Sequence, residues 1–234
     1  MSLDTIRLSK RLLAVASFVE SGAFVADIGS DHAYLPTYLI KKGIAQKAIA
    51  GEVAEGPYQS ATKNVVRQGV MDRVSVRLAN GLFAIEESDE VDTVTIAGMG
   101  GPLIVTILDS GKTRLKGIRR IIAQPNLHAK SIREWAVANS WEIVNEEILK
   151  EDGKIYEILV LEKGEMKYDE LEILVGPFLL VEKNDAFREK WASEITQWHQ
   201  VLKSIENASE TTETLKKIEQ LTRNIHIVGK ALAK

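Results

Sequence analysis

The sequence contains no cysteine, which excludes disulfide bonds, thiolate nucleophiles and thiolate metal ligands together. Histidine is also scarce: four are scattered over 234 residues, and none stands at a His-x-x-x-His spacing. A metal site would therefore have to be built from carboxylates. We expect that no metal is required.

Long hydrophobic runs are missing too. No apolar run approaches the roughly 20 residues that cross a bilayer. At the amino terminus, Asp4 and Arg7 precede Leu8, so the apolar core of a signal peptide is absent. We therefore expect a cytoplasmic protein with no membrane partner. The length allows one α/β domain of ordinary size and a smaller appendage. It does not determine the oligomeric state, for which we take a monomer as the expectation.

An overall excess of positive charge is lacking, because the net charge is −3. Attraction of the whole molecule to a polyanion is thus disfavoured, but local clusters can still steer one. One cluster contains Arg7, Lys10 and Arg11. The other is a stretch of nine residues with five cations and no acid, and its cations are Lys112, Arg114, Lys116, Arg119 and Arg120. These clusters are candidates for contact with a polyanion, or else solvated helix ends and loops.

Short apolar runs alternate with helix-period segments over the first 140 residues. The expected strands are 23–28, 47–52, 74–78, 93–97 and 120–124, and the expected helices are 34–42, 57–68, 103–108 and 131–138. This alternation predicts right-handed crossovers and a parallel sheet covered on both faces. Ligands on such sheets bind beyond the carboxyl ends of the strands, near the point where the strand order reverses.

The end of this domain predicts an antiparallel hairpin. Two β-like runs, 141–150 and 154–163, are separated by little more than Asp152 and Gly153, a two-residue turn signal. A parallel sheet that finishes in such a hairpin fits class I (Rossmann-like) methyltransferases better than dinucleotide dehydrogenases, by analogy of fold. We therefore expect a methyltransferase domain over residues 1–164.

Residues 165–234 are expected to form a connector and an antiparallel helical hairpin. The connector, 165–184, is broken by Gly176-Pro177 and is expected to pack partly on the first domain. Beyond it, apolar residues recur every three or four positions from Phe187 to Ile205, and again from Leu215 to Val228 after a polar break at 206–210. Two such helices are expected to pack together in a coiled-coil-like manner, with the apolar stripes in their core.

The first candidate site follows the first strand, at Asp27, Gly29, Ser30, Asp31 and His32. Glycine there allows the backbone to approach a ligand closely. The full Gly-x-Gly-x-x-Gly pattern is absent, because Asp31 and Tyr34 occupy its second and third glycine positions. A carboxylate at that place disfavours a pyrophosphate and suits a ligand with an ammonium or sulfonium group, such as S-adenosylmethionine. The alternative is a tight turn in which Asp27 caps the helix.

Two further segments belong to the expected cofactor site. Glu52 ends the second strand, where an acid can accept hydrogen bonds from ribose hydroxyls, although NAD sites use the same device. Asn80 and Gly81 follow the third strand, beside the expected position of an adenine ring. Asn-Gly is also simply a turn signal.

The expected acceptor site lies at the ends of the fourth and fifth strands. Gly98, Met99, Gly100 and Gly101 place three glycines in four residues, as expected where a ligand comes close to the backbone. Gln124, Pro125 and Asn126 add amides and a rigid corner, but neither an acid nor a base. Such a site fits an acceptor nitrogen whose lone pair is already free, such as N1 of adenine. We therefore name no general base and expect positioning to supply the acceleration.

Five segments together resemble the TrmK family of bacterial tRNA (adenine(22)-N1)-methyltransferases. They are Leu8-Ser-Lys-Arg-Leu12, the run 26–36 with its Asp-x-Gly-x-Asp-His-Ala-Tyr pattern, Asn80-Gly-Leu82, Ala97-Gly-Met-Gly-Gly101 and Gln124-Pro-Asn126. The resemblance covers nearly the whole chain. It implies a cofactor site for S-adenosylmethionine at the residues named above, with an adenine pocket near 98–101 and 124–126. His32 is either part of that site or hydrogen-bonded within the turn.

The resemblance also implies a tRNA partner whose target base leaves its stack. We expect Lys10, Arg11, the stretch 112–120 and the helical hairpin to hold the RNA backbone on the pocket side of the sheet. Three alternatives stay open at this point. The chain could be a non-catalytic RNA- or protein-binding module that responds to S-adenosylmethionine, a methyltransferase with a small-molecule or protein acceptor, or an NAD-dependent oxidoreductase.

Overall fold

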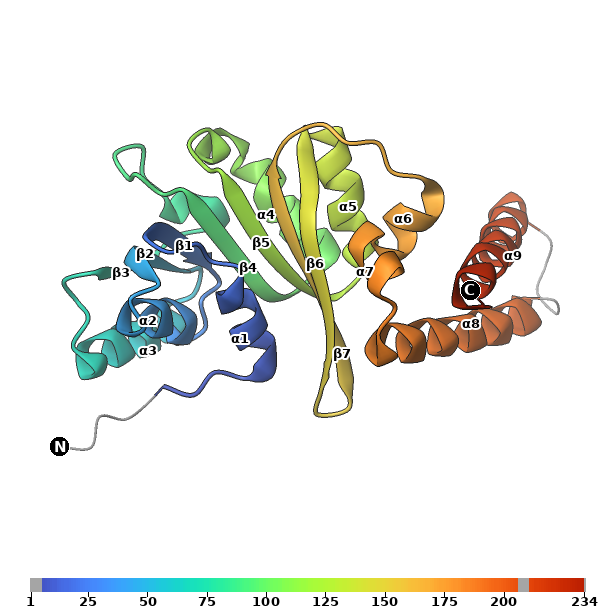
Figure 1. Cartoon of the computed structure of the whole chain (residues 1–234). Helices are drawn as coiled ribbons and strands as arrows, with labels where there is room; N and C mark the ends of the chain where they lie inside the picture. Colours follow the sequence, from blue (N-terminus) through green and yellow to red (C-terminus); the bar gives the residue numbers. More distant parts are fainter. Residues whose placement is uncertain (1–5, 206–210, 234) are drawn as a thin grey trace. The chain divides into compact units, whose positions relative to one another are not determined.

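The computed structural model describes residues 6–205 and 211–233. The chain divides into two compact units (Figure 1). The first comprises residues up to Glu147 together with Tyr156–Lys167, and the second comprises Ile148–Ile155 and residues from Tyr168 onward. The polar break expected at 206–210 lies outside the described residues.

The first unit is built on a seven-stranded sheet with the order β3-β2-β1-β4-β5-β7-β6. Its strands are β1 (Ala23–Ile28), β2 (Ala45–Glu52), β3 (Val74–Leu78), β4 (Thr93–Gly100), β5 (Arg120–Leu127), β6 (Trp141–Glu151) and β7 (Lys154–Lys163). The first five are parallel, and β7 pairs with β5 in the antiparallel direction. The Rossmann-like class and its terminal hairpin are thereby confirmed.

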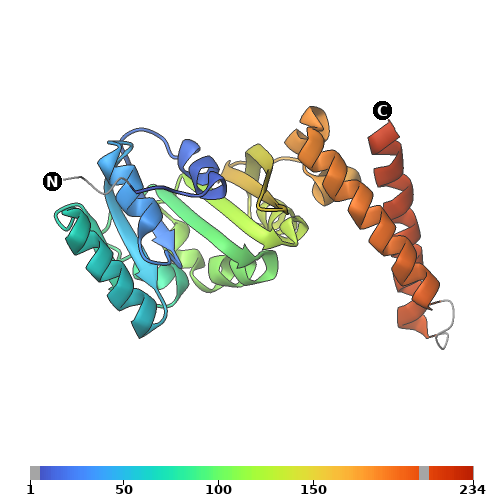
Figure 2. The ribbon, with the colours of Figure 1, turned by 90° about the horizontal axis from the view of Figure 1, so that it is seen from below.

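Helices cover both faces of this sheet. They are α1 (Lys10–Ser17), α2 (Tyr34–Lys41), α3 (Glu55–Gln68), α4 (Gly101–Ser110) and α5 (Ala129–Ala138), with short 3-10 turns η1 (Gly81–Ala84) and η2 (Lys112–Leu115). Because the crossovers leave β1 in one direction and β4 in the other, α2 and α3 cover one face and α4 and α5 the opposite one (Figure 2). The strand order reverses between β1 and β4, which marks the expected ligand position.

The β6–β7 turn follows the predicted chemistry. Asp152 and Gly153 have φ values of 50° and 75°, so both occupy the left-handed conformation that a two-residue turn requires. The boundaries of the other predicted elements shift by a few residues. The largest change is at β4 and β5, which extend three residues further than expected because the loop residues themselves pair across the strands.

The second unit is helical. It contains α6 (Glu170–Val175), α7 (Pro177–Glu182), α8 (Asp185–Ile205) and α9 (Thr212–Ala233), and α8 and α9 pack side by side (Figure 2). Its core contains Phe187, Trp191 and Val228 of the predicted stripes, and the connector adds Leu174, Val175 and Leu179. Leu215, expected in the stripe, is instead 54% exposed. The predicted helical hairpin is confirmed, and the connector packs into its core.

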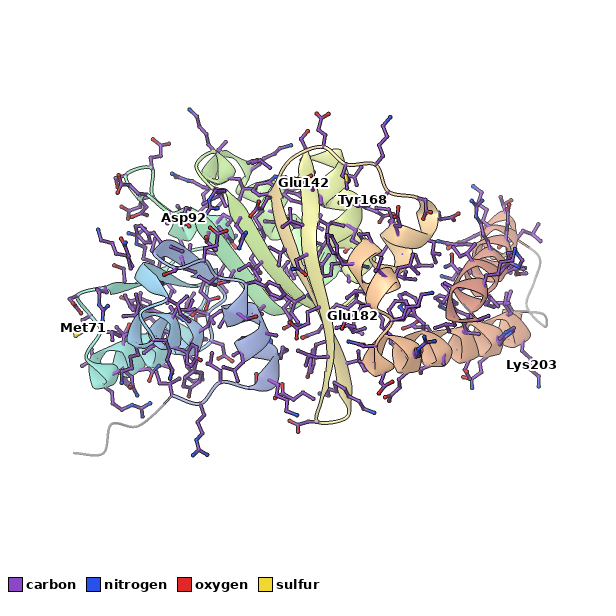
Figure 3. The ribbon with its side chains drawn as sticks, in the orientation of Figure 1. Met71, Asp92, Glu142, Tyr168, Glu182 and Lys203 are labelled. Atoms are coloured by element: carbon purple, nitrogen blue, oxygen red, sulfur yellow. The ribbon has the colours of Figure 1, made fainter. Side chains whose placement is uncertain are left out.

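The basic stretch 112–120 lies at the edge of the sheet opposite to the expected pocket, which corrects the predicted placement. The crossover helix α4 carries the chain from the end of β4 back to the level where the parallel strands begin. There the backbone amides of Arg119 and Arg120 donate to the carbonyl of Asp92. Asp92, labelled in Figure 3, lies immediately before β4.

The side chains of this stretch also have protein partners. Arg119 pairs with Glu20, and Arg120 pairs with Glu20 and Glu162. Arg114 lies 3.8 Å from Glu87, and Lys112 donates to Asn139, whereas Lys116 is exposed. Sequence spacing revealed the cluster, but not the edge to which the helix would deliver it.

Candidate functional site

The turn after β1 is wound in the left-handed conformation. Gly29 has a φ of 69°, and Asp31, His32 and Ala33 follow with φ values of 44°, 68° and 54°. Three consecutive non-glycine residues in this region are uncommon and need support from their surroundings. The backbone amides of Gly29 and Ser30 both donate to the carbonyl of Gly51 in β2, which ties the turn to the neighbouring strand.

Asp27 supports this turn from below. Its side chain is 4% exposed, and its two oxygens accept hydrogen bonds at 2.6 Å from Ser30 Oγ and Thr95 Oγ1. Burial raises the pKa of Asp27 above its usual range, although the two hydroxyl donors oppose the shift. Asp27 does not cap α2, because that helix begins after Ala33 without a side-chain cap. Its visible contacts brace β1, the turn and β4 together.

Glu52, the last residue of β2, has a carboxylate oxygen that accepts no hydrogen bond from the described residues. The residue is 5% exposed, and its Oε1 is buried without a hydrogen-bond partner among the described residues. Burial is the main cause that raises its pKa; the backbone N–H of Asp31 opposes the shift, and the carboxylates of Asp27 and Asp31 reinforce it. Burying an unsatisfied charged acceptor is costly unless a ligand completes it.

The remaining predicted cofactor residues surround this edge. Asp31 is highly exposed, and His32 is half-exposed with its Nε2 3.4 Å from Asp31 Oδ1 and its ring 5.5 Å from that of Tyr34. Asn80 is exposed directly after β3, beside the backbone bond from Ala79 N to Glu52 O. Gly81 has a φ of 56°, and a Cβ there would approach Ile107 Cγ2 to 3.0 Å.

The three glycines at the end of β4 have different structural surroundings. Gly98 has a φ of 79° at an irregularity in the β4–β5 pairing. A Cβ on Gly101 would lie 2.2 Å from the carbonyl oxygen of His128, so that glycine permits α4 to start against α5. Only Gly100 faces open space with an ordinary backbone. Packing against α5 therefore explains Gly101 and the left-handed backbone explains Gly98, and a ligand close to this loop stays a prediction.

Met99 joins the two expected sites. A Cβ on Gly29 would lie 2.1 Å from Met99 Cε, so the thioether side chain rests directly on the turn after β1. This contact falls at the point where the strand order reverses between β1 and β4. The loop after β4 and the cofactor turn are thus immediate neighbours, as methyl transfer between their ligands requires.

The amides at the end of β5 hold the backbone of Gly98. Gln124 is fully buried, and its Oε1 accepts from Gly98 N at 3.0 Å and from the guanidinium of Arg11. Asn126 Nδ2 donates to Gly98 O at 2.7 Å. Pro125 pairs with Met99 across the strands. The structure thereby brings 98–101 and 124–126 together.

Lys10 and Arg11, which we expected to contact the RNA backbone together, both lie on α1 but differ in their surroundings. Arg11 is partly buried: it donates to Gln124, and its Cζ lies 5.4 Å from the ring centre of Tyr156 in β7. Lys10 is exposed on the same helix. The side chain of Arg11 therefore contacts the buried amide of Gln124 beneath the loop 98–101 and is not only a surface cation.

Sequence reasoning missed two residues that support the site. Thr95 lies buried within β4 and donates to Asp27. Asn64, on α3, is 5% exposed and donates from Nδ2 to the carbonyl of His32 at 2.8 Å, in the middle of the left-handed turn. Asn64 stands with Ala61 and Val65 on the buried face of its helix. An amide side chain among the apolar residues of this helix face was the sequence signal that could have identified Asn64.

Within 6–205 and 211–233, no group of three histidine, aspartate or glutamate side chains is arranged to hold a metal ion. None of the helices in the same ranges is both long and apolar enough to span a bilayer.

Comparison with known proteins identifies the family. The family model described as tRNA (adenine(22)-N(1))-methyltransferase, TrmK, matches residues 25–230. The chain is 42% identical over 236 residues to the tRNA (adenine(22)-N(1))-methyltransferase of Bacillus subtilis, covering 98% of this chain and 99% of that one. The chain belongs to the TrmK family. The resemblance noted from the sequence motifs is thereby confirmed.

Solved TrmK structures match the same fold. A Streptococcus pneumoniae protein, described as a putative tRNA (m1A22) methyltransferase in complex with S-adenosyl-L-methionine, is 45% identical with a TM-score of 0.88, over 97% of this chain and all of that one. The TrmK protein of M. capricolum, in complex with S-adenosyl-homocysteine, is 30% identical with a TM-score of 0.84, over 97% and 98% of the two chains.

Proposed function

We propose that this member of the TrmK family transfers the methyl group of S-adenosylmethionine to N1 of adenine 22 in tRNA. The observation that carries the proposal is the buried, unpartnered Oε1 of Glu52 at the carboxyl edge of the sheet, one strand away from the left-handed turn after β1. A ribose hydroxyl supplies the donor that this oxygen lacks. Membership of the family and two relatives solved with the cofactor or its product support the same reading.

The residues around this edge fit the cofactor. Gly29, Ser30, Asp31 and His32 form a left-handed backbone turn braced by Asp27, and Asn80 and Gly81 follow the end of β3 beside Glu52. Bound there, S-adenosylmethionine supplies an electrophilic methyl group on a cationic sulfur. The negative charge of this edge complements that cation, whereas it would oppose the pyrophosphate of a dinucleotide. The NAD-dependent alternative is disfavoured for that reason.

The acceptor residues position the base and move no proton. The bond from sulfur to the methyl carbon breaks, its electron pair stays on sulfur, and the lone pair of adenine N1 forms the new bond. Positive charge thus moves from sulfur to the base, and no general base is needed. Gly98, Gly100 and the amides of Gln124 and Asn126 define where the base rests. Alignment of this kind can contribute on the order of 7 to 11 kcal/mol in favourable cases.

The tRNA partner requires contacts beyond the pocket. Extruding a base costs a few kcal/mol that backbone contacts must offset. Lys10, which is exposed on α1 and precedes Arg11 in the sequence, is our candidate for a phosphate contact. We further propose that 1–164 acts as the catalytic domain of a monomer and 165–234 as an accessory RNA-contacting domain. Because tRNA is its substrate, we place the enzyme in the cytoplasm.

The decisive experiment incubates the protein with methyl-labelled S-adenosylmethionine and unmodified tRNAs, followed by mapping of the labelled nucleoside. We expect 1-methyladenosine at position 22, and Glu52→Lys and Asp27→Lys should abolish labelling. Asp72→Lys, an exposed reversal just before the start of β3 and outside the proposed RNA contacts, is the matched control. Tight cofactor binding without transfer to any tRNA would instead favour the non-catalytic binding module, and label on a protein or small molecule would change the acceptor.

A further inference from the structure

The amides below the acceptor loop have orientations that their partners dictate. Gln124 Oε1 receives the backbone N–H of Gly98 at 3.0 Å and the guanidinium of Arg11. Both partners can only donate, so the shared atom must be the oxygen of the amide and not its nitrogen. Gln124 Nε2 then points toward Pro125 O at 2.9 Å and Asn126 Oδ1 at 3.4 Å.

The same reasoning fixes Asn126. Its nitrogen lies 2.7 Å from the carbonyl oxygen of Gly98, which can only accept. Asn126 Oδ1 is therefore presented as an acceptor, facing the Nε2 donor of Gln124. One hydrogen-bonded chain, the amide relay, thus joins Arg11, Gln124, Asn126 and the backbone of Gly98. Each donor and acceptor in the amide relay is oriented by its neighbour.

Arg11 is the fixed end of this amide relay. Its helix α1 begins with a side-chain cap, from Leu12 N to Ser9 Oγ at 3.2 Å, and the face of Tyr156 holds the guanidinium from the other side. A cation at this position forces Oε1 of Gln124 toward α1, since a flipped amide would point its own donors at the guanidinium. The charge of Arg11 thereby determines the polarity of two amides across β5.

Asn126 is the exposed end. It lies beyond the last buried residue of β5, and among the described residues its Oδ1 has only the long contact of 3.4 Å to Gln124. A carbonyl oxygen has two lone pairs, so it can take a second, shorter hydrogen bond. The relay therefore presents an exposed, directed acceptor beside Gly98, in the loop that we propose holds the acceptor base.

The chemistry of adenine supplies the matching donor. Its 6-amino group adjoins N1, the atom to be methylated. As N1 gains the methyl group, positive charge spreads over the N1–C6–N6 unit, and the amino hydrogens become stronger donors. A hydrogen bond to an oxygen at that position is stronger in the transition state than in the ground state, which is the condition for catalysis. Guanine carries an oxygen in place of the amino group and would be repelled.

We propose that Asn126 Oδ1 accepts a hydrogen bond from the 6-amino group of the target adenine, and that Arg11, acting through Gln124, positions that oxygen. Asn126 is then a catalytic and base-selecting residue, and Arg11 a positioning residue instead of a phosphate ligand. This inference rests on the proposed function, because it assigns the contact that selects the acceptor base.

The contact at Asn126 is tested by comparing the parent enzyme and a variant on two tRNA substrates. Single-turnover rates are measured at saturating cofactor for tRNA with adenine at the target position and for the same tRNA with purine, which lacks the amino group. Asn126→Ala should slow adenine methylation about 10- to 100-fold. The same variant should change purine methylation less than threefold, because the amino group is already missing. Intrinsic differences between the two bases cancel in this comparison.

Two variants at the same position keep the test independent of folding. Asn126→Asp retains an acceptor and should keep most of the preference for adenine, while it loses the donor to Gly98 O. Cofactor affinity, measured by calorimetry, should stay within about twofold in both variants if the fold is intact. Equal rate losses on adenine and purine would overturn the assignment of Asn126. A parent enzyme that methylates no adenine would overturn the proposed function itself.

Arg11 is tested by separating rate from RNA affinity. Arg11→Gln should lower the single-turnover rate on adenine at saturating tRNA and leave purine nearly unaffected, with the slope of tRNA affinity against salt unchanged. Arg11→Lys, which keeps a cationic donor, should restore part of the rate. Arg73→Gln, an exposed arginine beside Asp72, controls for loss of charge. A flattened salt slope with a normal rate at saturation would show a phosphate ligand and overturn the positioning role.

Discussion

Two pairs of buried carboxylates lie in the first unit and differ in how they are compensated. Glu146 and Glu157, on β6 and β7, share the guanidinium of Arg133 on α5 at 2.7 and 2.5 Å, and all three side chains are at most 4% exposed. Asp27 and Glu52, on β1 and β2, have no arginine or lysine in a described salt bridge, and one oxygen of Glu52 has no donor among the described residues.

The difference distinguishes a structural cluster from our proposed binding site. The Arg133 cluster is completed within the protein and fastens α5 to the terminal hairpin. Burial disfavours the charged forms of Asp27 and Glu52, and this raises the pKa of each carboxyl group. We propose that a ligand with hydroxyl donors supplies the hydrogen bond that Glu52 lacks. Buried charge alone therefore does not distinguish the two pairs; the missing donor at Glu52 does.

The largest effect is expected from breaking the completed cluster. Arg133→Ala leaves two buried carboxylates facing each other, so the free energy of unfolding should fall by about 3 to 5 kcal/mol. Denaturant titration followed by circular dichroism measures the change. Replacing the cluster as a whole, with Arg133→Met, Glu146→Leu and Glu157→Leu, should recover most of the loss. A single variant as stable as the parent would contradict this account.

The next effect has opposite signs on binding and stability. Glu52→Gln removes a charge-assisted acceptor for the ribose, so S-adenosylmethionine should bind more weakly by about 1.5 to 3 kcal/mol. The same change removes a buried, incompletely paired charge and should leave the free energy of unfolding equal or higher. Calorimetry and denaturant titration give both numbers. Glu219→Gln, on the surface of α9, should alter neither. Loss of stability in Glu52→Gln would mean that the charge is already compensated.

A pH dependence follows from the raised pKa values of Asp27 and Glu52. Between the ordinary carboxyl pKa and the raised one, the folded protein binds more protons than the unfolded chain. These groups therefore make the free energy of unfolding fall as the pH rises through that window and add no further slope above it. Cofactor affinity should rise over the same window, because the ribose requires ionised Glu52. Glu52→Gln should reduce both slopes, and unchanged slopes would assign them to other groups.

The smallest effect is expected at the amino edge of the sheet, where Arg119 and Glu20 are both substantially exposed. Exposed ion pairs contribute little, so Arg119→Ala should change the free energy of unfolding by less than about 1 kcal/mol. Because this edge is opposite to the site, the salt slope of tRNA affinity should change by less than the roughly 0.7 to 0.9 expected for one phosphate contact. Filter binding at several salt concentrations measures it, and a full unit of change would place RNA at this edge.

The sequence by itself determined the fold class, because the information is local. Alternating apolar runs, glycine stops and the Asp152-Gly153 turn specify the elements, and right-handed crossovers then leave few arrangements. It also predicted which loops form the candidate site, since the carboxyl ends of parallel strands meet at one edge. Residues such as Gly29, Glu52 and Gln124 could be named from their positions after the strands.

Only the tertiary structure decided how those residues are completed. The roles of Arg11, Asn64 and Thr95 depend on contacts between elements far apart in the chain, as in the bond from Arg11 to Gln124 across 113 positions. The edge reached by the basic stretch 112–120 likewise depends on the crossover through α4. Periodicity records which face of an element is buried, whereas hydrogen-bond partners and compensation of charge are set by packing between elements, and no local pattern records them.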